Sequence, residues 1–115
     1  MSKIVEKQIE AYNKKDLEEF LACYAEETQA FMLESNQQLT NGKEQLRQIM
    51  SKSFLDAPES NSSVLNSLTQ GNLVINKEKI TGHTKNDMII TTLSIYEVIN
   101  NQITKVWFGG RQVEK

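Results

Sequence analysis

The sequence is short of the residues that cross-link, ligate or bend a chain, with one cysteine, one histidine and one proline among its 115 residues. A lone Cys23 cannot form a disulfide within the chain, and this cysteine usage predicts a reducing, cytoplasmic location. One histidine, one cysteine and no carboxylates at ligand spacing argue against a metal site. Gly109 and Gly110 follow a predicted strand but lack the helix and the spacing of a dinucleotide site, so no cofactor is expected.

Neither sign of charge is in clear excess, since 13 lysines and arginines stand against 15 aspartates and glutamates for a net charge of -2. Without a basic face, neither nucleic acid nor an anionic membrane is expected as a partner. No window approaches the roughly 20 apolar residues that span a bilayer, and the N-terminal stretch MSKIVEKQIE lacks the apolar core of a signal peptide. One domain over residues 1–115 should bury roughly two thirds of its unfolded surface.

The strongest secondary-structure signal lies between Met88 and Phe108. The run MIITTLSIYEV is rich in β-branched and aromatic residues, and a second such run, ITKVWF, follows after a polar break. Asn100 and Asn101 in that break can adopt the positive φ angles of a tight turn. The two runs are therefore predicted to form an antiparallel hairpin at the centre of a sheet.

Three helices are predicted in the first half of the chain. The first is broken at Asn13–Lys15, and Asp16 with Glu19 then forms the capping box of a second helix that ends near Ala25-Glu26. Asn41 with Glu44 repeats this signature before a third helix. The apolar stripes of the three helices are Ile4, Val5, Ile9 and Tyr12; Leu17, Phe20, Leu21 and Tyr24; and Leu46, Ile49, Met50 and Phe54.

Shorter strands are predicted at 28–33 and 37–40. A loop at 55–63, which holds Pro58, precedes strands at 63–71 and 73–80, the second of them broken by the polar residues 76–79. A polar turn at 82–87 leads into the long hairpin, and Gly109-Gly110 allows a bend before a short charged tail. Elements in this order predict an α+β domain with helices on one face of a sheet.

Three stretches, IEAYNKKDLEEFLACYAEE (9–27), LTNGKEQLRQI (39–49) and IYEVINNQITKVWF (95–108), occur in a distinctive order and spacing. Together they resemble the superfamily of nuclear transport factor 2, ketosteroid isomerase and the SnoaL-like polyketide cyclases. The resemblance implies a cone-shaped, cystatin-like α+β fold, in which a curved antiparallel sheet wraps around a pocket closed by three helices from the N-terminal half. It also implies that small apolar or amphipathic molecules bind in the pocket, and that many members form dimers through the outer sheet face.

The catalytic groups of ketosteroid isomerases have no equivalents at the matching positions. The position of the base falls on Met32, that of the oxyanion-hole tyrosine near Gln8, and that of the oxyanion-hole aspartic acid near Ser94. Glu34 lies just after the base position and could replace only one of these three groups.

An epoxide hydrolase of this fold needs an Asp-Arg-Asp set that activates water. Here Asp16 is explained as a helix cap, while Asp56 and Asp87 lie in a predicted loop and a predicted turn. This reading therefore has little support from the sequence.

His83 is the one side chain that titrates near neutrality when unperturbed, and it could act as a general base that Asp87 orients. The polar stretch around it favours instead an exposed turn residue. Cys23 lies on the second helix with no histidine nearby in sequence, so a buried and inert thiol is predicted.

The resemblance places one face of the long hairpin in the pocket, and the two-residue period of a strand assigns the rest of that face. The predicted ligand-binding residues are Tyr12, Phe20, Met32, Met50, Phe54, Met88, Ile90, Ser94, Tyr96, Val106 and Phe108. The opposite face includes Ile89, Thr91, Leu93, Ile95 and Trp107. Because that face is too apolar for solvent, a homodimer through it is predicted.

Three functions remain open: binding of a small apolar or amphipathic molecule, an isomerase or cyclase in which the usual catalytic residues are replaced, and a protein-interaction domain. Tyrosine, threonine and serine among the apolar residues favour the first function, because such groups orient a ligand. An ionisable side chain buried within the cavity would favour the enzyme.

Overall fold

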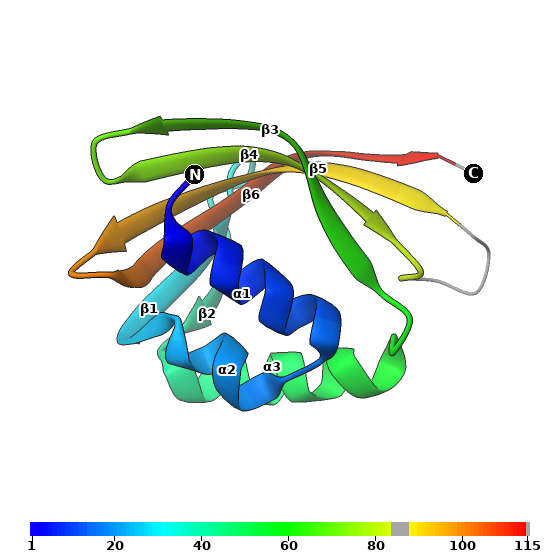
Figure 1. The fold of residues 1–115 in the computed structure, drawn as a ribbon, viewed down its shortest axis with the longest axis horizontal. Coiled ribbons are helices and arrows are strands. Elements are labelled where there is room, and N and C mark those ends of the chain that lie inside the picture. Colours follow the sequence, from blue (N-terminus) through cyan, green and yellow to red (C-terminus); the bar gives the residue numbers. More distant parts are fainter. Residues whose placement is uncertain (84–87, 115) are drawn as a thin grey trace.

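The computed structural model describes residues 1–83 and 88–114, and over these ranges it confirms the predicted α+β order (Figure 1). The helices are α1 (Lys3–Lys14), α2 (Leu17–Ala22) and α3 (Lys43–Asp56). The strands are β1 (Tyr24–Met32), β2 (Gln38–Asn41), β3 (Asn61–Gln70), β4 (Leu73–Thr81), β5 (Ile89–Ile99) and β6 (Gln102–Glu114). None of the described helices is long and apolar enough to cross a bilayer.

The strands form a six-stranded sheet in the order β2-β1-β6-β5-β4-β3. The pairing of β1 with β6 is parallel, and the other pairings are antiparallel. The predicted hairpin is confirmed as the two central strands, β5 and β6. Asn100 and Asn101 form its turn with φ angles of 52° and 61°.

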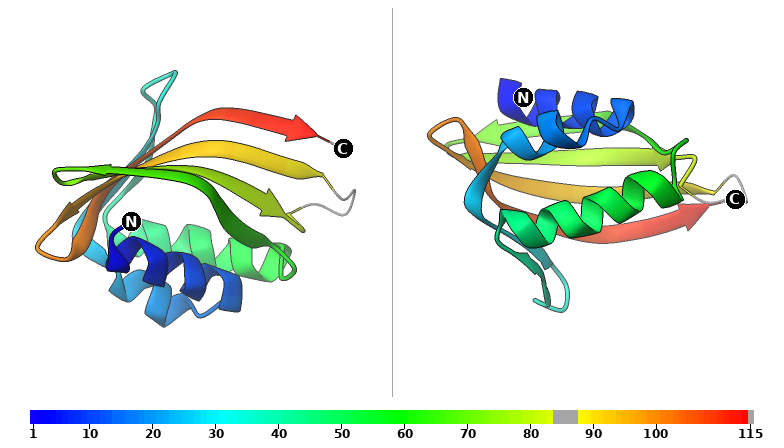
Figure 2. Two further views of the ribbon diagram at one scale, coloured as in Figure 1. Left: turned by 45° about the horizontal axis from the view of Figure 1, so that its top comes forward. Right: turned by 90° about the horizontal axis from the view of Figure 1, so that it is seen from below.

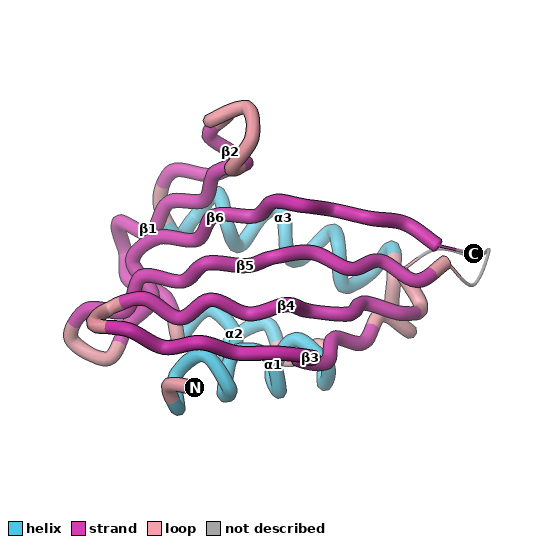
Figure 3. The backbone as a smooth tube through the Cα atoms, turned by 90° about the horizontal axis from the view of Figure 1, so that it is seen from above, coloured by secondary structure: helices cyan, strands magenta, loops and turns pink. Residues whose placement is uncertain are grey.

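The helices lie against one face of the sheet, and no described helix covers the other face (Figure 1). Seen from above, the strands run side by side over the helices (Figure 3). The sheet curves around them without closing into a barrel (Figure 2). Register shifts in the β5–β6 ladder, at Thr91/Leu93 and Glu97/Val98, contribute to this curvature because bulges bend and twist a strand. The predicted cone-shaped architecture is therefore confirmed.

Side chains alternate between the helix-covered and the outer face of the sheet. A row across the helix-covered face consists of Thr40, Ala30, Val106, Tyr96 and Val74. Each residue of this inner row is buried. The neighbouring row on the outer face, which we call the outer row, consists of Phe31, Trp107, Ile95, Ile75 and Leu68.

The second helix is shorter than the sequence predicts. α2 ends at Ala22, and Tyr24 begins β1 instead of closing the helical stripe. Tyr24 pairs with Ile103 of β6, a contact between residues far apart in the chain that helical spacing cannot reveal. The predicted helix boundary before α2 is confirmed, because Lys15 adopts a left-handed conformation and Asp16 accepts a hydrogen bond from the Glu19 backbone N–H at 3.1 Å.

The start of α3 also differs from the prediction. Gly42, with φ 96°, is the N-cap residue and forms no side-chain capping bond. The predicted cap, Asn41, is the last residue of β2, where its backbone N–H donates to Gln45 Oε1 at 2.9 Å. A side chain inside the helix thus reaches back to the preceding strand.

Three predicted interruptions are shorter or absent. α3 continues to Asp56 and β3 begins at Asn61, so the loop predicted at 55–63 is confined to 57–60. β4 runs unbroken through residues 76–79, and β6 continues past Gly110 to Glu114 instead of ending in a tail. In both places the backbone pairs with β5, and ladder hydrogen bonds hold a strand whose side chains are polar.

Candidate functional site

A cavity of about 390 Å³ lies between the helices and the sheet. Each helix and each strand labelled in Figure 1 contributes at least one residue to its wall. Leu39 of β2 and Ile49 of α3 line the cavity although they are 39% and 48% exposed, so they mark its mouth. Pockets for small ligands enclose roughly 300–1,000 Å³, and this cavity lies at the small end of that range.

The cavity brings together six of the predicted ligand-binding residues, namely Tyr12, Phe20, Met50, Tyr96, Val106 and Phe108. Phe54 is buried behind the wall, where its ring lies edge-on to those of Tyr12 and Phe20 at centroid distances of 5.7 Å and 5.9 Å. Ile90 and Ser94 are buried and Met32 and Met88 are half-buried, and these four side chains do not form part of the wall.

A buried carboxylate on β4, that of Glu78, lines the cavity and is 5% exposed. Ser94 Oγ donates to Glu78 Oε1 at 2.8 Å, and the Tyr96 hydroxyl donates to Oε2 at 2.7 Å. Asn76 Nδ2 is a third donor, 3.3 Å from Oε2. An ionised carboxylate accepts about four hydrogen bonds, so these neutral donors satisfy most of its capacity.

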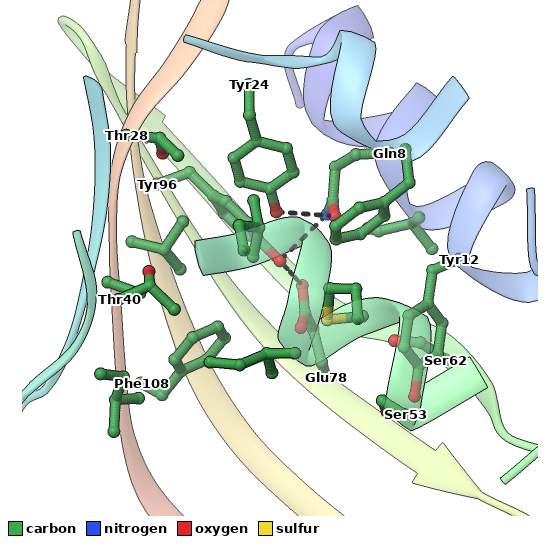
Figure 4. Close-up of a pocket in the computed structure, with 18 of the residues that line it drawn as sticks. Gln8, Tyr12, Tyr24, Thr28, Thr40, Ser53, Ser62, Glu78, Tyr96 and Phe108 are labelled. Atoms are coloured by element: carbon green, nitrogen blue, oxygen red, sulfur yellow. Dashed lines mark hydrogen bonds between the residues drawn. The ribbon is translucent and has the colours of Figure 1, made fainter. Parts of the chain in front are cut away.

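The hydrogen bonds continue away from Glu78 as a chain (Figure 4). Because the hydrogen of the Tyr96 hydroxyl points to Glu78, the hydroxyl oxygen accepts from Gln8 Nε2 at 3.2 Å. The amide oxygen of Gln8 then faces Tyr24, whose hydroxyl donates to it at 3.1 Å. Gln8, Tyr24 and Tyr96 are all buried, and every donor in the chain points towards the carboxylate.

Three tyrosines line the cavity, and burial raises the pKa of each above its ordinary value of 10.0. The negative charge of Glu78 raises the pKa further at Tyr12, Tyr24 and Tyr96. The tyrosines therefore remain neutral hydrogen-bonding groups at neutral pH, and the charge of Glu78 acts across the cavity.

Thr40 places a second kind of polar group in the wall. Its hydroxyl is buried and has no hydrogen-bond partner among the described residues. Leaving a buried hydroxyl unpaired costs about 1–3 kcal/mol.

The histidine considered as a base lies outside this cavity. His83 is exposed and borders a small surface depression together with Lys52 and Asp56. Asp87, its possible orienting partner, lies outside the described residues. Asp56 forms an exposed ion pair with Lys52 at 2.7 Å.

The other candidates from the sequence also lie away from the cavity wall. Glu34 is exposed and accepts a hydrogen bond from the Gly110 backbone N–H at 2.6 Å, which lowers the pKa of its carboxyl group. Asp16 caps α2. Cys23 is buried, as predicted, and burial raises the pKa of its thiol.

Sequence reasoning missed Glu78 because residues 76–79 resemble a polar break in a strand. A two-residue period counted from Val74 places Asn76, Glu78 and Ile80 on one face, and this alternation was the available signal. Gln8 and Ser94, near which the resemblance places the oxyanion-hole positions of ketosteroid isomerases, are both buried in the hydrogen-bond network around Glu78.

Comparison with known proteins agrees with this architecture. The model of a family described as "SnoaL-like domain" matches residues 5–106. No curated protein sequence matches the chain.

Solved structures share the fold at low sequence identity. A cystatin-fold protein from Novosphingobium aromaticivorans is 18% identical, with a TM-score of 0.84 over 94% of this chain and 97% of that one. An NTF2-like protein of unknown function from Cytophaga hutchinsonii is 17% identical, with a TM-score of 0.74 over 96% and 87%. A protein with a ketosteroid isomerase-like fold from Catenulispora acidiphila, solved in complex with trimethylamine, is 13% identical, with a TM-score of 0.79 over 94% and 85%.

Proposed function

Because the chain belongs to the family of SnoaL-like domains, we propose that its cavity binds a small apolar or amphipathic molecule. The observation that carries the proposal is the cavity of about 390 Å³ between helices and sheet. Apolar and aromatic side chains form most of its wall, with a few polar groups among them, which is the composition of small-molecule sites. We also propose that residues 1–115 act as one such domain. A cytoplasmic location stays a prediction from the lone Cys23.

A polar group in the wall supports a ligand that is amphipathic rather than purely apolar. The carboxylate of Glu78 on β4 lines the cavity and accepts three hydrogen bonds, which leaves about one acceptor position free. A wholly apolar ligand would leave that position without a partner, which is unfavourable in a buried site. The ligand is therefore expected to carry at least one hydrogen-bonding group.

The proposal is tested by filling the cavity. Ala30 lines the wall from β1 and is 8% exposed, so Ala30→Leu would extend an apolar side chain into the space. Cyclohexylmethanol serves as a neutral amphipathic probe, and its binding is followed by ligand-observed NMR. We expect saturable binding at one site per chain, weakened about tenfold or more by Ala30→Leu, because the probe and the new side chain need the same volume.

The matched control is Ala22→Leu, the same substitution at an exposed position of α2. This control should bind the probe like the unchanged protein. Equal binding by Ala30→Leu would show that the probe occupies another place, and would contradict the proposal.

One observation favours a second candidate function, that of an isomerase or cyclase: Glu78 is a carboxylate buried in the cavity. A carboxylate within reach of a bound molecule can act as a general base. Proton NMR in D2O would measure the exchange of the hydrogens next to the carbonyl group of cyclohexanone. If Glu78 is the base, exchange is faster with the unchanged protein than with Glu78→Gln, whereas equal rates refute this role.

We propose further that the protein forms a homodimer through the outer row, Phe31, Trp107, Ile95, Ile75 and Leu68. These apolar side chains cross five strands on the face that no described helix covers. Phe31 and Trp107 stack at 6.2 Å between ring centroids, and Leu68 is 60% exposed. A contiguous apolar surface of this kind favours burial against another subunit.

Sedimentation equilibrium of Ile95→Lys tests the dimer, since a lysine in the middle of the outer row would place a charge inside the interface. We expect the unchanged protein to sediment as a dimer and the variant as a monomer. Leu55→Lys is the control, because Leu55 is 80% exposed on α3 and lies away from the outer face. A dimer that survives Ile95→Lys would place the interface elsewhere.

A further inference from the structure

The wall of the cavity carries one formally charged side chain, that of Glu78, and its residues include no lysine, arginine or histidine. None of the ion pairs formed within residues 1–83 and 88–114 involves Glu78. The basic neighbours of Glu78 in sequence, Lys77 and Lys79, alternate to the outer face of β4. The buried carboxylate therefore has no cationic partner in the described part of the protein.

The contacts of Glu78 stabilise its charge without neutralising it. Ser94, Tyr96 and Asn76 are all neutral donors. Hydrogen bonds to an ionised group are stronger than those between neutral groups, and they allow a carboxylate to remain charged in a buried place. A carboxylate has about four acceptor positions, and these three donors use three of them. Glu78 can therefore accept one more hydrogen bond from a group inside the cavity.

The charge of Glu78 affects wall residues on several elements of the fold. It contributes to the raised pKa of Tyr12, Tyr24 and Tyr96, which belong to α1, β1 and β5. A negative potential in a space with low-dielectric walls attracts cations and repels anions more strongly than it would in water.

Aromatic rings add to this preference. Phe20 of α2 and Phe108 of β6 line the cavity together with the three tyrosines. The face of an aromatic ring is electron-rich and attracts an organic cation, most strongly where water is excluded. Carboxylate and rings together favour one class of ligand over neutral and anionic molecules of the same size.

We propose that the ligand of this cavity is an organic ammonium compound, with a protonated amine that binds Glu78 and a small apolar body that contacts the aromatic and aliphatic wall. This inference rests on the proposed function, since it names the chemical class of the molecule that the cavity binds. The amine donates to the remaining acceptor position of Glu78, and the pairing neutralises the buried charge.

Three probes with the same ring but different charge test the inference: cyclohexylmethylamine, cyclohexylmethanol and cyclohexanecarboxylate. Their dissociation constants are measured at neutral pH, where the amine is protonated and the acid ionised. We expect the amine to bind about tenfold or more tightly than the alcohol, and the carboxylate to bind most weakly, because a charge-assisted hydrogen bond replaces a neutral one.

The variant Glu78→Gln removes the charge while keeping the size of the side chain. Its one amide oxygen can accept from Tyr96 and Asn76, and the Ser94 hydroxyl can turn to accept from the new NH2 group. The variant should reduce the preference for the amine over the alcohol to about threefold or less. The ranking of the three probes by the unchanged protein decides the question even if this variant does not fold.

Each outcome separates this inference from the function on which it rests. If the alcohol binds as tightly as the amine, or if Glu78→Gln weakens both probes equally, the ammonium ligand is refuted while small-molecule binding stands. If none of the three probes binds, the proposed function itself is overturned.

Discussion

Removing the hydroxyl group of Tyr96 should destabilise the protein more than removing that of Tyr24. The Tyr96 hydroxyl donates to the Glu78 carboxylate at 2.7 Å and accepts from Gln8 at 3.2 Å. A hydrogen bond to a charged group contributes about 1.5–3 kcal/mol and a neutral one about 0.5–1.5 kcal/mol, so Tyr96→Phe should lower the free energy of unfolding by about 2–4.5 kcal/mol. For a domain that is stable by about 5–15 kcal/mol, this loss is large.

Tyr24→Phe is the matched control, since it removes the same atom from a ring that is equally buried. Tyr24 is the residue of the hydrogen-bond chain that lies farthest from Glu78, and its hydroxyl forms one neutral hydrogen bond, to Gln8. Its loss should cost about 1 kcal/mol. Urea unfolding followed by circular dichroism, at one protein concentration for all variants, gives the two free energies.

The charge of Glu78 should account for much of the difference between the two tyrosines. In the Glu78→Gln background, Tyr96→Phe should cost at least about 1 kcal/mol less than it does in the unchanged protein, because the bond it removes is then neutral. A cost of Tyr24→Phe equal to that of Tyr96→Phe would refute the reasoning, as would an unchanged cost in the Glu78→Gln background.

Three further predictions concern pH, a glycine and a helix cap. The pKa values of the three tyrosines are raised, so the folded protein keeps protons that the unfolded chain loses above the ordinary pKa of 10.0. The contribution of the tyrosines to the free energy of unfolding is therefore fully present below that pH and falls above it, by up to about 1.4 kcal/mol per pH unit for each tyrosine. An unchanged urea midpoint in alkaline solution would contradict this prediction. Gly82→Ala should lower the melting temperature more than Gly71→Ala, because both have positive φ but only at Gly82 would the new Cβ lie 2.2 Å from the Glu59 carbonyl oxygen. Asp16→Ala should lower the free energy of unfolding in urea by about 1 kcal/mol, because it removes the cap of α2. The control Asp56→Ala breaks an exposed ion pair and should lower it by under about 0.5 kcal/mol. Equal effects of the two substitutions would argue against the cap.

The parts of the fold that the sequence predicted depend on local chemistry. Asn100 and Asn101 tolerate positive φ, and the flanking runs are strand-forming, so the central hairpin follows from neighbouring residues alone. The same holds for the boundary at Lys15 and Asp16. The end of α2 could not be predicted this way, because Tyr24 suits the helical stripe and its place in β1 depends on Ile103.

The candidate site was predicted less completely, for a similar reason. Tyr96, Val106 and Phe108 follow from strand alternation once the inner face is known. Glu78 was hidden because a buried carboxylate breaks the rule that inward positions are apolar. The donors that compensate for the burial of Glu78, Ser94 and Tyr96, belong to another strand. The sequence around Glu78 therefore could not predict these hydrogen bonds.

The parallel pairing of β1 with β6 has a consequence for the order in which the protein is built. The strands β3, β4, β5 and β6 each pair antiparallel with the next strand in sequence, so the partners are close together along the chain. β1 instead pairs with the part of β6 from Ile103 to Phe108, which lies some eighty residues further along the chain. Contacts of such long range form slowly because a long loop must close first. During synthesis, the wall that β1 and β2 contribute can join the sheet only after β6 has left the ribosome, so the cavity gains this wall after the other strands can already have paired.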